Sequence, residues 1–192
     1  MPAILPLVGL ALITAAAPAS ESPSPAARIS SHQQALDEGS ALEDRRLNRE
    51  AAAAYRRAAA EAKAHGSYAD EAYARARECR AVWNAGESSK ARRLCQESLA
   101  LSRLARSRRG EAEAEKMLGV LDQENGDYAL AETRLRRALD LASRSNEEEI
   151  AISSLNNLSA GALEQGRVAD AVALAEEASR RASHFPGVSV RM

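Results

Sequence analysis

The sequence predicts an all-α fold in which antiparallel helix hairpins stack as an α-solenoid. Aromatic residues make up only 3% of the 192 residues, whereas alanine is abundant, and this composition favours close-packed helices over β-sheets. Three glycines, Gly86, Gly126 and Gly166, are each separated by forty positions. Apolar residues around them recur at helical spacing, so the chain is predicted to be a tandem array of two-helix units.

The first nineteen residues have the composition of a secretory signal peptide. They carry no charged side chain and end in Ala17-Pro18-Ala19, a small-x-small cleavage pattern. Their apolar run is short for a membrane-spanning helix, which needs about 20 residues. We therefore expect residues 1–19 to be removed on export, and the alternatives are an uncleaved membrane anchor or a start codon placed too far downstream. Residues 20–31 are rich in Pro and Ser and are predicted to be a disordered linker.

Residues 32–71 are predicted to cap the N-terminal end of the array. Ala51, Tyr55 and Ala58 lie at positions that match the second helix of the later units, but Arg46 replaces the turn glycine. No convincing first helix precedes them. This segment is therefore interpreted either as one long capping helix or as a degenerate repeat.

Three repeat units follow, at residues 72–111, 112–151 and 152–186, and residues 187–192 form a tail. In each unit one helix precedes the turn glycine and a second helix follows it. Small residues recur at fixed distances on both sides of that glycine, where a bulky side chain would push the two helices apart. These recurring residues are Cys79, Gly119 and Ser159 before the turns and Ala91, Ala131, Ala171, Ser98, Ala138 and Ala178 after them.

The middle unit resembles a tetratricopeptide repeat. It has the Leu-Gly pair of that family at Leu118-Gly119, its turn glycine at Gly126, and its second-helix alanines at Ala131 and Ala138. The resemblance implies a right-handed solenoid that binds other proteins and has no enzymatic activity of its own. The other units keep fewer of these residues, namely Gly86 and Ala91 in the first and Gly166, Ala171 and Ala178 in the third.

The period of forty departs from the period of about 34 residues that is common in this family. The additional residues are predicted to lengthen the second helix or the loop that follows it. The long period resembles that of the repeats of kinesin light chains and of bacterial arrays attached to signalling or caspase-like protease domains.

Two cysteines, Cys79 and Cys95, lie on the two predicted helices of the first unit. Both occupy small-residue positions that face the partner helix, so they are interpreted first as buried core residues. If the protein is exported, a disulfide between them is the alternative. A catalytic nucleophile is disfavoured because no histidine has a predictable position beside either cysteine.

The sequence shows no catalytic, metal-binding or cofactor-binding constellation. His32, His65 and His184 are scattered and lack the spacing of metal ligands. The basic run at residues 102–110 is interpreted as arginines at the C-terminal end of a helix, where cations are favoured. Nucleic-acid binding is the disfavoured alternative, because the formal net charge is only −1 and no aromatic residues interleave the run. We therefore expect no enzyme, no metal and no cofactor.

Function is predicted to reside on the first helix of each unit, because these helices line the concave side of a helical solenoid. Trp83 is the sharpest case, since it is either a core residue or an exposed anchor for a partner. The predicted partner-binding groove consists of Tyr73, Arg77, Arg80, Trp83, Lys116, Met117, Gln123, Ser153, Asn156 and Asn157.

The sequence thus predicts an exported scaffold, periplasmic or extracellular, that binds another protein or a peptide. A cytoplasmic or membrane-anchored location is the alternative to export. We expect it to contact neither nucleic acid nor, after signal cleavage, a membrane. One alternative is that the chain is the N-terminal sensory or scaffolding segment of a larger bacterial signalling or caspase-like protease protein, whose catalytic domain lies beyond residue 192. Another is that it forms a homo-oligomer through an uncapped C-terminal face.

Overall fold

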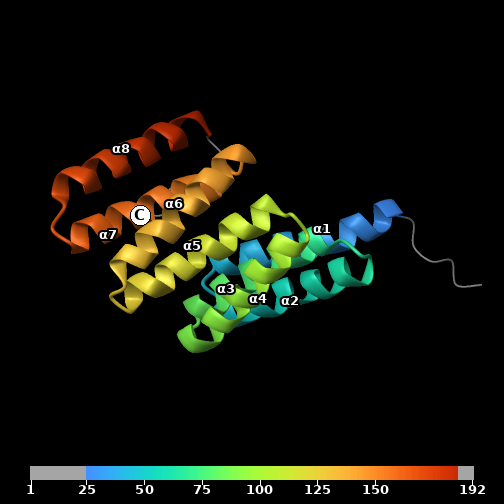
Figure 1. Ribbon diagram of the computed structural model, residues 1–192. Coiled ribbons are helices and arrows are strands. Elements are labelled where there is room, and N and C mark those ends of the chain that lie inside the picture. The colour runs from blue at the N-terminus through green and yellow to red at the C-terminus, as the bar shows by residue number, and fades with distance from the viewer. Residues whose placement is uncertain (1–24, 186–192) are drawn as a thin grey trace, which may run out of the picture.

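In the computed structural model, which describes residues 25–185, the chain forms a row of antiparallel helices without a β-strand in this range (Figure 1). The all-α solenoid predicted from the sequence is confirmed. The row runs from α1 and α2 at one end to α7 and α8 at the other. None of the helices in this range is long and apolar enough to cross a membrane. The helices are α1 (Pro25–Asp44), α2 (Asn48–Ala64), α3 (Tyr68–Asn84), α4 (Ser88–Leu104), α5 (Arg108–Glu124), α6 (Tyr128–Arg144), α7 (Glu148–Glu164) and α8 (Val168–His184).

Every turn between consecutive helices uses the same backbone conformation. The middle residue of each three-residue turn has a positive φ, which lets the chain satisfy the last carbonyls of the helix. At Gly86, for example, its N–H donates to Trp83 O and the N–H of Glu87 donates to Val82 O. Glycine adopts this conformation at the least cost, which explains its recurrence in the sequence. The seven residues are Arg46, Gly66, Gly86, Arg106, Gly126, Asn146 and Gly166.

Alternate helices form two layers. The A layer contains α1, α3, α5 and α7, and the B layer contains α2, α4, α6 and α8. Each helix packs on its neighbours in sequence, and α5 also packs on both α3 and α7. The B helices make no comparable contacts with one another within the described residues. Because neighbouring A helices approach each other more closely than neighbouring B helices do, the A layer lies on the concave side of the array.

The small residues predicted from the repeat lie where the two helices of one hairpin meet. Gly119 of α5 is so close to α6 that an added Cβ would lie 2.8 Å from Leu135 Cγ and 3.2 Å from Ala131 O. In the last hairpin, Ser159 Oγ donates to Ala171 O at 2.7 Å. The other signature residues are buried, namely Ala91, Leu118, Ala131, Ala138, Ala171 and Ala178.

Replacing Gly119 by Ala is expected to destabilise the protein by about 1–2 kcal/mol, although alanine has the higher helix propensity. The added methyl would displace Leu135, which is fully buried. Gly161→Ala is the matched control, because a Cβ there would meet mainly the movable end of the Gln123 side chain. Urea denaturation should find the Gly161 variant as stable as the wild type or more so. Equal stability of the two variants would show that the hairpin has room at Gly119.

The N-terminal segment is a helix hairpin, which agrees with the degenerate-repeat alternative and not with one long capping helix. The chain turns at Arg46 with a φ of 59°, and α1 packs along α2. Gly39 of α1 occupies the position equivalent to Gly119, since an added Cβ would lie 2.5 Å from Tyr55 Cε1. The Tyr55 ring fills the space beside Gly39, as Leu135 does beside Gly119.

The ends of the array differ in part from the sequence prediction. Because α1 begins at Pro25, residues 25–31 are helical and not a disordered linker. The predicted signal peptide (residues 1–19), the start of the predicted linker and the predicted tail (residues 187–192) lie outside the described residues.

The repeat units begin four residues before their predicted starts. Their first helices start at Tyr68, Arg108 and Glu148. The additional residues of the long period were expected to lengthen the second helix or the loop that follows it. Instead both helices of each of these hairpins have 17 residues, and all the turns are equally short.

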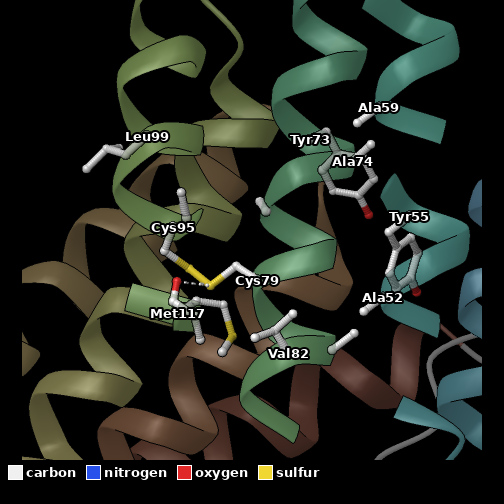
Figure 2. Close-up of a cluster of buried hydrophobic side chains, with 14 of the residues drawn as sticks. Ala52, Tyr55, Ala59, Tyr73, Ala74, Cys79, Val82, Cys95, Leu99 and Met117 are labelled. Carbon is white, nitrogen blue, oxygen red and sulfur yellow. Dashed lines mark hydrogen bonds between the residues drawn. A yellow bond between two sulfur atoms is a disulfide. The ribbon is translucent and has the colours of Figure 1, made fainter. Parts of the chain in front are cut away.

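Most of the hydrophobic core is one cluster that extends from α1 to α7. Figure 2 shows a disulfide between Cys79 of α3 and Cys95 of α4, with Val82 and Met117 nearby. The Cα atoms of the two cysteines are 5.5 Å apart, and both residues are fully buried. The disulfide alternative is therefore confirmed, and these cysteines offer no free thiol.

Candidate partner-binding surface

The concave layer carries ionised side chains from four successive A helices. They include both signs of charge and lie close enough to form ion pairs within α5 and between different A helices. We call them the A-layer cluster. Its members are Glu43 of α1, Arg77 and Arg80 of α3, Glu113 and Lys116 of α5, and Glu149 of α7.

Glu43 joins the first two hairpins. Its buried carboxylate accepts hydrogen bonds from the Tyr55 hydroxyl at 2.6 Å, from Arg77 at 3.2 Å and from Arg80 at 2.5 Å. Arg77 also donates to the Tyr55 hydroxyl at 2.7 Å. Burial opposes ionisation of Glu43, but Arg80 and Arg77 outweigh it and hold the pKa of the carboxyl below its usual value. Charge-assisted bonds of this kind are strong when shielded from water, so they fix the contact between α1 and α3.

Glu113 and Lys116 form a buried ion pair one helical turn apart on α5. The Lys116 ammonium donates to the Glu113 carboxylate at 2.7 Å, and the residues are 2% and 1% exposed, respectively. Arg80 of α3 lies 3.7 Å from Glu113 and 3.8 Å from the exposed Glu149 of α7. Burial opposes ionisation of Glu113, but Lys116, Arg80 and Arg77 together hold its pKa at about 2. A buried charge is tolerated only when it is paired, so this pair depends on the neighbouring arginines of α3.

Acid is expected to remove the contribution of Glu113 to stability. Its pKa falls from 4.5 to about 2 on folding, so the stabilisation is complete above pH 4.5 and is lost as the pH falls toward 2. A shift of this size corresponds to about 3 kcal/mol. Urea unfolding of the wild type and Glu113→Gln across this window should show a steeper loss in the wild type. Parallel curves would show that folding does not lower the pKa of Glu113.

Four of the ten residues predicted to form the groove are buried. Arg77 and Lys116 belong to the A-layer cluster, while Tyr73 and Met117 pack in the core at 5% and 2% exposure. The Tyr73 hydroxyl accepts a hydrogen bond from Arg77 at 2.8 Å, and the Arg109 guanidinium lies 3.7 Å above its ring. We therefore remove these four from the groove, because neighbouring helices and not solvent cover them. They were predicted from their positions on the first helix of each unit, but the depth of such a position depends on the next hairpin.

The other six predicted residues remain partly exposed, and some of them connect neighbouring A helices. The Trp83 indole donates to Glu124 Oε1 at 2.6 Å, which joins α3 to α5. The Gln123 amide donates to Asn157 O at 2.8 Å, which joins α5 to α7. Trp83 is thus half-buried, and it is neither a fully buried core residue nor a fully exposed anchor. The six are Arg80, Trp83, Gln123, Ser153, Asn156 and Asn157.

The chemistry of this surface is that of hydrogen bonding and ion pairing. Within residues 25–185, no three or more His, Cys, Asp or Glu side chains are grouped so as to hold a metal ion. His32 is buried instead, with Nδ1 2.9 Å from Ala58 O. What the concave layer can present to a partner is a set of amide, indole and guanidinium groups on a rigid row of helices.

The fold and this surface define a class of protein, the α-solenoid of two-helix repeats with a concave inner layer. Residues 110–184 match the family model described as tetratricopeptide repeat, which supports assigning this segment to that family. Proteins built from this repeat generally mediate protein–protein interactions and are typically not enzymes. The comparison with curated proteins gave no match.

A solved structure supports the fold. The crystal structure of BtubC (BKLC) from P. vanneervenii superposes with a TM-score of 0.57 at 18% sequence identity. The alignment covers 84% of this chain and 66% of that chain, so this chain spans slightly less than two thirds of its length. At this identity the similarity shows the shared fold alone.

Proposed function

We propose that this protein is a non-enzymatic scaffold that binds a protein or peptide along its concave A layer. The tetratricopeptide repeats support this class of function. The observation that carries the proposal is the series of partly exposed bonding groups on successive A helices, with Trp83 on α3, Gln123 on α5 and Asn156 on α7. A peptide laid across these helices would meet each group in turn.

Trp83 is the proposed anchor of this surface. Its indole is half-buried and is oriented by the hydrogen bond to Glu124, so little conformational freedom remains to be lost on binding. Tryptophan is enriched among the residues that dominate binding energy at interfaces. The A-layer cluster holds the helices beneath it in fixed positions and thereby preorganises the surface.

The test is quantitative affinity capture with the full chain, comparing the wild type with Trp83→Ala/Asn156→Ala. Leu130→Ala is the matched control, because Leu130 is an exposed apolar residue of the B-layer helix α6. The concave variant is expected to lose specific partners that the control retains, while thermal melting shows both variants folded. If both variants capture the same partners in the same amounts, the concave surface is not the binding site.

We also propose that the protein is exported. The buried disulfide supports this location, because disulfides persist in oxidising compartments and are rare in the cytosol. Sequencing of the mature protein from its source should then find Ser20 at the N-terminus. Recovery of the protein with residues 1–19 still attached would contradict cleavage.

A further inference from the structure

A second charged surface lies at the edge of the array where the B helices end and the A helices begin. A cleft of about 710 Å³ opens there between the end of α4, the start of α5 and the last turns of α6. Its lining includes Arg103, Arg106, Arg108, Arg109 and Arg137, with Glu111 as the acidic member. We call it the arginine cleft.

The floor of the arginine cleft is fixed by internal ion pairs. Arg103 of α4 and Arg137 of α6 both donate to Glu111 Oε1, at 3.2 and 2.7 Å. Both also lie near Glu115, at 2.8 and 3.5 Å. Burial opposes ionisation of Glu111, but Arg137 and Arg103 outweigh it and keep the pKa of that carboxyl below its usual value. These two guanidinium groups are therefore held in place by carboxylates that have already lost part of their water.

The rim of the cleft carries positive charge that nothing in the described chain neutralises. Arg109 pairs with Glu147 at 3.2 Å, but no carboxylate of residues 25–185 lies within 4.0 Å of Arg106 or Arg108. The five arginines of the cleft have three carboxylates as ion-pair partners, namely Glu111, Glu115 and Glu147. The excess of two positive charges thus belongs to Arg106 and Arg108, both exposed at the start of α5.

We propose that the arginine cleft binds an acidic peptide segment of a partner protein. Two exposed guanidinium groups above a floor of paired arginines match the carboxylates of a short Asp- or Glu-rich segment, and Leu141 offers an apolar wall for its backbone. A nucleic acid fits less well, because the carboxylates among the arginines interrupt the basic stripe that a phosphate backbone needs.

This site is separate from the proposed concave surface. The arginine cleft surrounds the first residues of α5, whereas Trp83 bonds to Glu124 at the last residue of that helix. At 1.5 Å per residue, the two ends of α5 lie roughly 24 Å apart. Binding in the cleft therefore does not depend on the proposed function of the concave layer.

The turn conformation of Arg106 allows a substitution that should weaken peptide binding without destabilising the fold. Arg106 has a φ of 53°, in the left-handed region that glycine prefers, so Arg106→Gly should fold at least as well as the wild type. Arg46→Gly is the matched control. Arg46 has a φ of 59° at the equivalent turn position and is also exposed, but it lies outside the cleft.

The probe is a short fluorescein-labelled peptide of alternating Glu and Gly, with the Gln–Gly peptide as its neutral counterpart. By fluorescence anisotropy at low salt, Arg106→Gly/Arg108→Gln is expected to weaken binding about fivefold to tenfold, because each exposed ion pair is worth up to about a fivefold change. Arg46→Gly should change it by less than about twofold.

Three results would overturn the proposal. In one, Arg46→Gly weakens binding as much as the cleft variant does, which would indicate attraction to overall charge. In another, the Gln–Gly peptide binds equally well. In the third, an oligouridylate binds more tightly than the Glu–Gly peptide and depends on the same two arginines, which would make the cleft a nucleic-acid interface.

Discussion

Replacing Glu113 by Ala is expected to destabilise the protein by about 3–5 kcal/mol, because Lys116 would remain buried without its carboxylate. Burial already lowers the pKa of Lys116, and Arg80 and Arg77 add like charge, while Glu113 opposes these effects. The variant must therefore deprotonate Lys116, move it to water, or unfold. Urea denaturation at neutral pH under non-oxidising, non-reducing conditions would measure the loss.

Two further variants separate this effect from the loss of a surface charge. Glu149→Ala should cost less than about 1 kcal/mol, since Glu149 is mostly exposed and lies 3.8 Å from Arg80. Glu113→Leu/Lys116→Met should recover most of the stability, because replacing a whole buried ion pair by apolar residues is often neutral or favourable. If Glu113→Ala costs no more than Glu149→Ala, the ion pair does not fix the position of α5.

Reduction of the disulfide is expected to destabilise the protein by about 3 kcal/mol. The bond joins residues that are 16 positions apart, and closing a loop of about that size restricts the unfolded chain by this amount. The loss should appear as a lower urea midpoint for the wild type after treatment with dithiothreitol. The reduced protein keeps both side chains, so the difference reports loss of the covalent link together with the small separation of the two sulfur atoms.

The Cys79→Ala/Cys95→Ala variant is the control for reduction. Its urea midpoint should not respond to dithiothreitol, and it should resemble the reduced wild type with a further small loss from the missing sulfur atoms. An unchanged midpoint for wild-type protein whose two thiols titrate as free would contradict the expected contribution.

The helix hairpins were predictable because contacts between helices in one hairpin recur in the sequence. Gly119 and Ala131 meet across one hairpin, and the same contact brings Ser159 to Ala171 in the next. For the first hairpin, the sequence did not decide between one long helix and two helices. There Arg46 occupies the turn position that is glycine in the other three hairpins, so the most regular signal of the repeat is missing.

The concave surface was predictable only in part, because its contacts join different hairpins. Arg80 bonds to Glu43, which is 37 residues away and on another A helix. No local pattern indicates such a pair. The spacing of Glu113 and Lys116 does indicate an ion pair on one helix face, but not that it is buried beside Arg80 of α3. The arginine cleft likewise required the end of α6 to be placed beside the run at residues 102–110.

The uniform turns have a consequence for how the gene of such a protein can change in length. The turn residues Arg46, Gly66, Gly86 and their successors are twenty positions apart, so the connections inside and between hairpins are alike. Losing one helix and its turn would rejoin the chain without a steric conflict, yet every later helix would move to the opposite layer and present the wrong face to its neighbours. Losing or duplicating two helices leaves each later helix in its own layer. Recombination is therefore tolerated in pairs of helices, and a new A helix enters the array together with the B helix that buries it.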